Sequence, residues 1–213
     1  WHAINFPEDG RRRGRSGDYR NADGTPSTGY EHVEVGLTGL ALLAFLGAGH
    51  THSDGEFKDT VKDALRYIRA IQDNDGAFGG INAREHESFM YNHSLCAMAI
   101  AEAYAMTGMT ILKGPAQRAV DFIAAAQNVD PDRGYLGWRY SVRPGESDSS
   151  VTGWCALALK SAAMAELDIP QHCWEGALRF LDDMTGPIRA AFGAGGAVSS
   201  GDQDFRTGYI SRA

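Results

Sequence analysis

The chain has 213 residues, of which 43% are hydrophobic, and its 20 basic and 27 acidic side chains give a net charge of −7. This length suits one domain with a sizeable core, no apolar run approaches a membrane span, and the acidic balance disfavours a general nucleic-acid surface. We therefore expect no nucleic-acid partner and no membrane-spanning segment. The sequence leaves open whether the protein is cytoplasmic or is exported after removal of a signal.

The first 28 residues predict an irregular N-terminal arm. Residues 7–29 are rich in Gly, Ser, Asp and Pro, and the only basic run lies within them at residues 11–15. We expect residues 29–213 to form one repeat domain. The chain opens at Trp1 and stops at Ala213 where another helix is expected to begin, so we expect a trimmed or processed piece of a longer protein.

Two kinds of helix alternate along the predicted repeat domain. The first kind is apolar or small nearly all round, which predicts burial on most sides. It is expected at residues 35–46, 95–106 and 153–167. The second kind has apolar residues at helical spacing on one face and charged residues on the other, which predicts surface helices. It is expected near residues 57–72, 115–127 and 170–184, with Pro115 in a first helical position. In this arrangement Leu157 would lie in a buried helix wall.

A glycine-rich turn motif at residues 72–80 returns in looser form 55 residues later, at 127–138. Asp-Gly and Gly-Gly pairs favour positive φ and tight reversal, and the aromatic residue is expected to pack over the preceding helix end. The sequence therefore predicts a structural role for the residues that define the motif. They are Gln72, Gly76, Phe78 and Gly80, and then Gln127, Gly134 and Trp138.

A second landmark is a small polar residue or His that opens an apolar run. It recurs, after intervals of 55, 59 and 55 residues, at Thr38, His93, Thr152 and Thr207. Alternating buried and one-sided helices predict two layers, with the first kind of helix innermost. The starts of the inner helices would converge on one mouth, where unpaired N–H groups and positive dipole ends favour function.

The turn Gln72-x-x-x-Gly76-x-Phe78 resembles the Q-x-x-x-G-x-W repeat of squalene–hopene cyclases, with Phe in place of Trp. The whole repeat cycle is similar to that of the prenyltransferase and squalene-cyclase superfamily, over roughly residues 29–213. This resemblance implies an all-α fold of the α/α-toroid type, in which helical-hairpin repeats form concentric rings, here as a partial ring.

The resemblance allows the catalytic motif of the cyclases to be checked. Those enzymes carry D-x-D-D-T at an inner-helix start, and the matching stretch here is Asp148-Ser149-Ser150-Val151-Thr152. Only the first Asp and the Thr are retained, and a serine hydroxyl cannot supply the acid that starts cationic cyclisation. Asp148 is therefore either a remnant of a catalytic acid or a helix cap.

The resemblance also allows the zinc site of prenyltransferase β subunits to be checked. In those subunits Asp-x-Cys from one inner helix and His from the next hold the zinc. The matching positions are Glu34-Val35-Gly36 and His93, and Gly36 supplies no thiolate. His93 and Cys96 lie at i and i+3 and are the remaining metal candidates; the alternative is a polar lining His and a packing Cys. We expect no cofactor.

Three classes of function stay open. The favoured one is a toroid that binds a hydrophobic small molecule or a peptide in its central cavity, with eroded catalytic motifs. The others are an isoprenoid-active enzyme and a polysaccharide-active enzyme that uses paired carboxylates. The catalytic candidates are Asp148, Glu87 and His93, with Glu85 as a further carboxylate. The predicted cavity-lining residues are Thr38, Tyr91, Tyr104, Thr152, Trp154 and Thr207.

Overall fold

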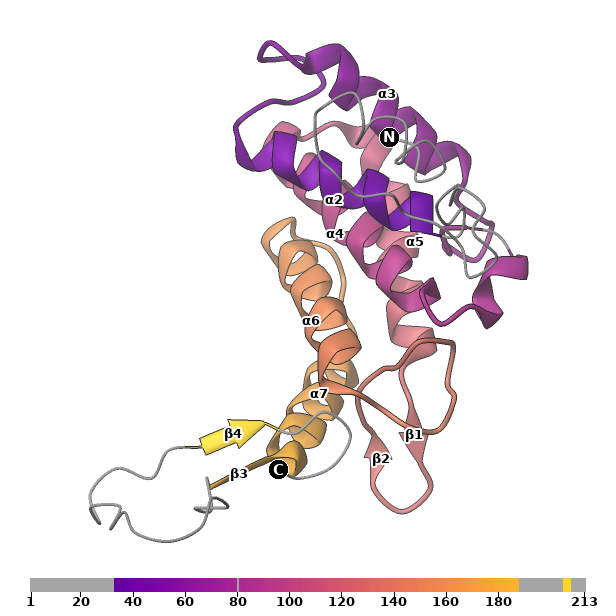
Figure 1. Cartoon of the computed structure of the whole chain (residues 1–213). Helices are drawn as coiled ribbons and strands as arrows, with labels where there is room; N and C mark the ends of the chain where they lie inside the picture. Colours follow the sequence, from indigo (N-terminus) through magenta and orange to yellow (C-terminus); the bar gives the residue numbers. More distant parts are fainter. Residues whose placement is uncertain (1–32, 80, 188–204, 208–213) are drawn as a thin grey trace, which may run out of the picture.

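The structure is a computed structural model that describes residues 33–79, 81–187 and 205–207 (Figure 1). Its α-helices are α2 (Glu34–Gly47), α3 (Lys58–Ala70), α4 (Phe89–Thr107), α5 (Thr110–Ala126), α6 (Ser149–Met164) and α7 (Gln171–Met184). A 3₁₀ helix, η3 (Ile81–Glu85), precedes α4. The antiparallel strand pairs are β1 (Val129–Asp130) with β2 (Gly134–Tyr135), and β3 (Thr185–Pro187) with β4 (Phe205–Thr207). The predicted all-α class is confirmed. The arm expected at residues 1–28 and Gly80 lie outside the described residues.

The helices pack in two layers that alternate along the chain. Helices α2, α4 and α6 lie side by side in chain order and form what we call the first layer. Helices α3, α5 and α7 form the second layer, where α3 packs on α2, α5 on α4 and α7 on α6 (Figure 1). Each second-layer helix has one buried face, as its one-sided apolar pattern predicts.

Small residues let the first-layer helices approach closely. A Cβ atom added to Gly36 would lie 2.3 Å from Oδ1 of Asn92, and one added to Gly39 would lie 2.9 Å from the backbone nitrogen of Cys96. The Cys96 thiol donates to the carbonyl oxygen of Val35 at 3.1 Å. Glycine is therefore required where α2 meets α4, because a side chain would push the two backbones apart.

The first layer departs from the sequence prediction in one respect, because one side of it is not covered by the described residues. Leu157 in α6 is 48% exposed and Leu40 in α2 is 47% exposed. The expectation that Leu157 lies in a buried helix wall is therefore wrong. Apolar residues all round a helix do not reveal whether its last face meets protein, a ligand or solvent.

Two predicted helix starts also differ in the structure. Helix α5 begins at Thr110, so Pro115 lies inside the helix and not in its first position. Thr207 lies in β4, paired with Thr185, where the sequence predicted the start of a fourth inner helix. In the described part of the chain no helix combines the length and apolarity that crossing a bilayer requires, in agreement with the prediction.

Candidate functional site

The uncovered side of the first layer carries a regular set of apolar side chains. One row consists of Leu40, Leu95 and Trp154, which are separated by the repeat intervals of 55 and 59 residues. The second row lies one helical turn further along and consists of Leu43, Met98 and Leu157. All six side chains are exposed or partly exposed. We call these six residues the inner apolar face.

Hydrogen bonds between equivalent positions hold α4 and α6 in register along this face. At one end the hydroxyl groups of Tyr91 and Ser150 form a short hydrogen bond. At the other end the Ser161 hydroxyl donates to Oε1 of Glu102 at 3.0 Å. The residues between these two pairs must be in the same register, so the two apolar rows continue across both helices. The inner apolar face is thus a strip with a polar group at each end.

The Tyr91 end of the strip opens into a polar depression of about 530 Å³. It is lined by His86, Glu87, Ser88, Tyr91 and Tyr140. The rings of Tyr91 and Tyr140 lie 6.0 Å apart, and Glu87 is exposed. The structure therefore brings together Glu87, which the sequence predicted as a catalytic candidate, and Tyr91, which it predicted to line the cavity.

Asp148 reaches this depression only through its neighbours. Its side chain is fully buried and caps α6, because Oδ1 accepts from the backbone N–H of Val151 at 2.8 Å. The same oxygen accepts from the Ser150 hydroxyl at 2.9 Å, and Ser150 in turn bonds Tyr91. The second oxygen, Oδ2, is buried with no hydrogen-bond partner among the described residues. Asp148 is thus the buried end of a chain that runs through Ser150 to Tyr91.

The structure places His93 in the core and not in the depression. Its Nδ1 accepts from the backbone N–H of Phe78 at 3.3 Å, so Nε2 carries the proton and donates to the carbonyl oxygen of Ala119 at 3.1 Å. Burial lowers the pKa of His93 to about 4, which keeps the imidazole neutral at physiological pH. Both ring nitrogens are occupied by backbone partners, so His93 holds the turn that ends at Phe78 against α5. We call a side chain in this role a bracket.

Thr152 occupies the equivalent position in the next repeat and makes the equivalent bond. Its hydroxyl oxygen accepts from the backbone N–H of Trp138 at 3.0 Å, and the side chain is fully buried. His93 and Thr152 therefore each hold the aromatic residue of the turn that precedes them. The sequence predicted the residue at this repeat position to lie at a cavity mouth. In these two repeats it instead holds the preceding turn.

The proposed metal pair does not converge. Cys96 bonds Val35 in α2, whereas His93 faces Phe78 and α5. Burial raises the pKa of Cys96 to about 12, so the thiolate that zinc requires is disfavoured. Within residues 33–79 and 81–187 there is no cluster of three or more His, Cys, Asp or Glu side chains able to hold a metal.

The motif glutamines fasten each turn to the next second-layer helix. Nε2 of Gln72 donates to the carbonyl oxygens of Gly76 at 3.1 Å and of Pro115 at 2.8 Å. Nε2 of Gln127 likewise donates to the carbonyl oxygens of Leu136 at 2.6 Å and of Cys173 at 3.2 Å. Each amide thus joins its own turn to α5 or α7.

The remaining motif residues support these turns. Phe78 and Trp138 are fully buried, and the Trp138 indole N–H donates to the carbonyl oxygen of Ile123 at 2.7 Å. Gly76 and Gly134 have φ values of +93° and +76°, a conformation that favours glycine. The second turn is five residues longer between its glutamine and its aromatic residue, and the ribbon β1–β2 lies within it.

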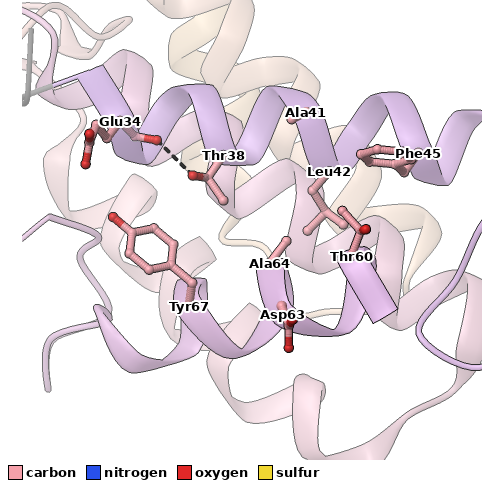
Figure 2. Close-up of a pocket in the computed structure, with 9 residues that line it drawn as sticks. All are labelled: Glu34, Thr38, Ala41, Leu42, Phe45, Thr60, Asp63, Ala64 and Tyr67. Carbon is pink, nitrogen blue, oxygen red and sulfur yellow. Dashed lines mark hydrogen bonds between the residues drawn. The ribbon is translucent and has the colours of Figure 1, made fainter. Parts of the chain in front are cut away.

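The other residues predicted to line the cavity separate into different places. Trp154 belongs to the inner apolar face, whereas Tyr104 packs against the core. Thr38 lines a different pocket, between α2 and α3, and its hydroxyl donates to the carbonyl oxygen of Glu34 at 2.9 Å (Figure 2). The side chain of Thr207 lies outside the described residues.

Sequence reasoning missed Tyr140 and the grouping of the six apolar residues. The repeat intervals were the available signal for the group, because equivalent positions of stacked repeats share one face. Tyr140 follows the longer second turn, and no periodic signal marks it.

No protein-family model, curated protein or solved structure matches this chain.

Proposed function

We propose that this chain is part of an α/α toroid of the prenyltransferase and squalene-cyclase type, and that it binds an apolar chain molecule on the inner apolar face without transforming it. The inner apolar face is the observation that carries this proposal. Large apolar side chains recur there at the same position in the three helices of the first layer, and all six are exposed or partly exposed. Covering them contributes about 25 cal/mol per Å² of apolar surface removed from water, whatever the catalytic groups do.

The contacts of the catalytic candidates support binding over catalysis. His93 is neutral and bonded to backbone on both nitrogens. Asp148 caps α6, and among the residues that the structure describes no second carboxylate bonds it. An acid that protonates an apolar substrate needs contact with that substrate, which a fully buried helix cap lacks.

A second candidate, an enzyme, draws on the hydrogen-bond chain from Asp148 through Ser150 to Tyr91. Such a chain could move a proton between the buried carboxylate and the depression, where Glu87 offers a further carboxylate. The reaction would be isoprenoid or polysaccharide chemistry. Turnover that is lost in both Tyr91→Phe and Asp148→Asn, with folding retained, would favour this candidate.

The binding proposal is tested by titrating the protein with farnesol and squalene while following tryptophan fluorescence, since Trp154 lies on the inner apolar face. Leu157→Glu should weaken binding at least tenfold, because the ligand would have to cover a charge. Leu178→Glu is the matched control, since Leu178 is 61% exposed on α7 in the second layer. Equal loss in both variants, or no saturable binding, would contradict the proposal.

Catalysis is tested in parallel by incubating the protein with squalene and with prenyl diphosphates, with and without zinc, and analysing the products. We expect no product in any of these mixtures. Binding of an apolar peptide in preference to farnesol would assign the inner apolar face to a protein partner instead.

A further inference from the structure

The pocket between α2 and α3 has a volume of about 330 Å³ and lies apart from the inner apolar face. Figure 2 shows Thr38 and Leu42 reaching from α2 toward α3, with Ala64 opposite them and the Tyr67 ring lying toward Glu34. Its floor is the apolar side chain of Leu42, which is almost completely buried. The equivalent positions of the next two repeats indicate what this pocket can hold.

The walls of this pocket recur in the second repeat, where they are filled. Moving 55 residues along the chain turns Thr38, Ala64 and Tyr67 into His93, Ala119 and Phe122. His93 bonds Ala119, and its ring lies 4.7 Å from that of Phe122. The turn at residues 72–78 occupies this space.

Three contacts seat that turn in the second repeat. The backbone N–H of Phe78 donates to His93, and the Phe78 ring lies 5.3 Å from the imidazole. Gly76 approaches α5 so closely that an added Cβ would lie 2.0 Å from the carbonyl oxygen of Arg118. Gln72 bonds Pro115 in the same helix.

The third repeat repeats this arrangement with different residues. Thr152 accepts from the N–H of Trp138, as His93 does from Phe78. An added Cβ on Gly176 in α7 would lie 2.5 Å from Nε2 of Gln127 and 2.7 Å from the carbonyl oxygen of Leu136. A first-layer helix and the second-layer helix packed on it thus form a socket twice, α4 with α5 and α6 with α7. Each socket holds a glutamine turn that ends in an aromatic residue.

In the first repeat the socket has its walls and its polar bracket but no such turn among the described residues. The hydroxyl group of Thr38 donates to Glu34, and no backbone N–H from the described residues donates to its oxygen. In the other two repeats the corresponding side chain receives that bond and is fully buried, whereas Thr38 stays 9% exposed.

We propose that the α2–α3 pocket is a docking socket for a turn peptide of the Gln-x-x-x-Gly-x-aromatic type. The aromatic ring would insert between Thr38 and Tyr67, its backbone N–H would donate to the Thr38 hydroxyl, and the glycine would lie against Asp63, the equivalent of Arg118. The equivalence of the three sockets argues for this occupant over an apolar small molecule, because both filled sockets combine a backbone hydrogen bond with an aromatic ring.

The test uses a labelled, end-blocked peptide with the sequence of residues 71–79, which is the turn of the second socket. Binding to the whole chain is followed by fluorescence anisotropy. We expect saturable binding that weakens at least tenfold when the residue corresponding to Phe78 is replaced by Ala. This comparison uses the unaltered protein, so it does not depend on the folding of a variant.

Two protein variants locate the binding. Ala64→Leu places a larger side chain in the pocket from its α3 wall and should weaken binding at least tenfold. Thr38→Val should weaken it about threefold to tenfold because one hydrogen bond is lost. Leu157→Glu should leave peptide binding unchanged, which separates this socket from the inner apolar face. The proposal is overturned by absence of saturable binding at millimolar peptide, by equal binding of the Ala peptide, or by displacement of the peptide with farnesol.

Discussion

The backbone N–H of Phe78 donates to Nδ1 of His93, 15 residues further along the chain, at 3.3 Å. His93 thereby holds the turn at residues 72–78, and Thr152 holds the corresponding turn of the next repeat. Imidazole and hydroxyl can exchange roles here because both offer a buried acceptor to a backbone N–H that would otherwise be unsatisfied. A histidine at a predicted cavity mouth is in this case part of the core.

The bracket predicts a pH dependence of stability. Burial lowers the pKa of His93 to about 4 in the folded state, against about 6.5 when the chain is unfolded. As the pH falls from about 6.5 to 4, the unfolded state takes up a proton that the folded state does not, so stability decreases by up to about 3 kcal/mol. Urea unfolding at pH 7.5 and pH 4.5 measures this loss.

The matched variant for that experiment is His93→Gln, which cannot titrate. The other histidines contribute equally to both proteins, so the difference between the two pH profiles isolates His93. Parallel profiles for wild type and variant would mean that this imidazole is protonated in the folded state as well.

Capping by Asp148 predicts a moderate loss of stability in Asp148→Ala. The carboxylate accepts from the N–H of Val151 and from the Ser150 hydroxyl, so its removal should cost about 1–2 kcal/mol. Asp148→Asn should cost less, because the amide keeps one acceptor oxygen. Thermal unfolding of both variants checks the order, and equal destabilisation would argue against capping as the main role.

Two glycines with similar backbone conformation should respond differently to alanine. Gly76 and Gly49 have φ values of +93° and +86°, but an added Cβ meets Arg118 at 2.0 Å in the first case and nothing within 4 Å in the second. Gly49→Ala should cost about 1–2 kcal/mol from the backbone alone. Gly76→Ala should cost about 1–3 kcal/mol more, because the turn must also move away from α5.

Denaturant midpoints of the two glycine variants provide the measurement. A difference within about 0.5 kcal/mol between Gly76→Ala and Gly49→Ala would show that the turn does not press on α5.

The open side of the first layer predicts unequal effects of Asp on two neighbouring leucines of α6. Leu159 is fully buried, whereas Leu157 is 48% exposed. Leu159→Asp should unfold the domain or cost several kcal/mol, since an unpaired charge would be buried. Leu157→Asp should cost about 1 kcal/mol or less. Circular dichroism melting distinguishes these outcomes, and a Leu157→Asp protein that fails to fold would place that side chain in the core.

The sequence by itself determined the alternation of helix types and the spacing of the repeats. The apolar periodicity of α3 and α7 was sufficient to predict a single buried face, because the spacing of 3.6 residues per turn relates position to direction. The glutamine and glycine positions of the turns were equally readable, since few residues accept positive φ. These signals are local, so they can be read from the sequence without knowledge of any partner element.

Only the tertiary structure decided which polar residues face inward. His93 and Tyr91 lie two positions apart on α4, yet one brackets a turn in the core and the other lines a polar depression. The sequence predicted both residues at the inner cavity, His93 at its mouth and Tyr91 in its lining, because it gives spacing along a helix but not the rotation of that helix against its neighbours. That rotation is fixed by close contacts between distant residues, such as Gly39 against Cys96. The exposed side of Leu157 was decided in the same way, because exposure depends on which elements surround α6.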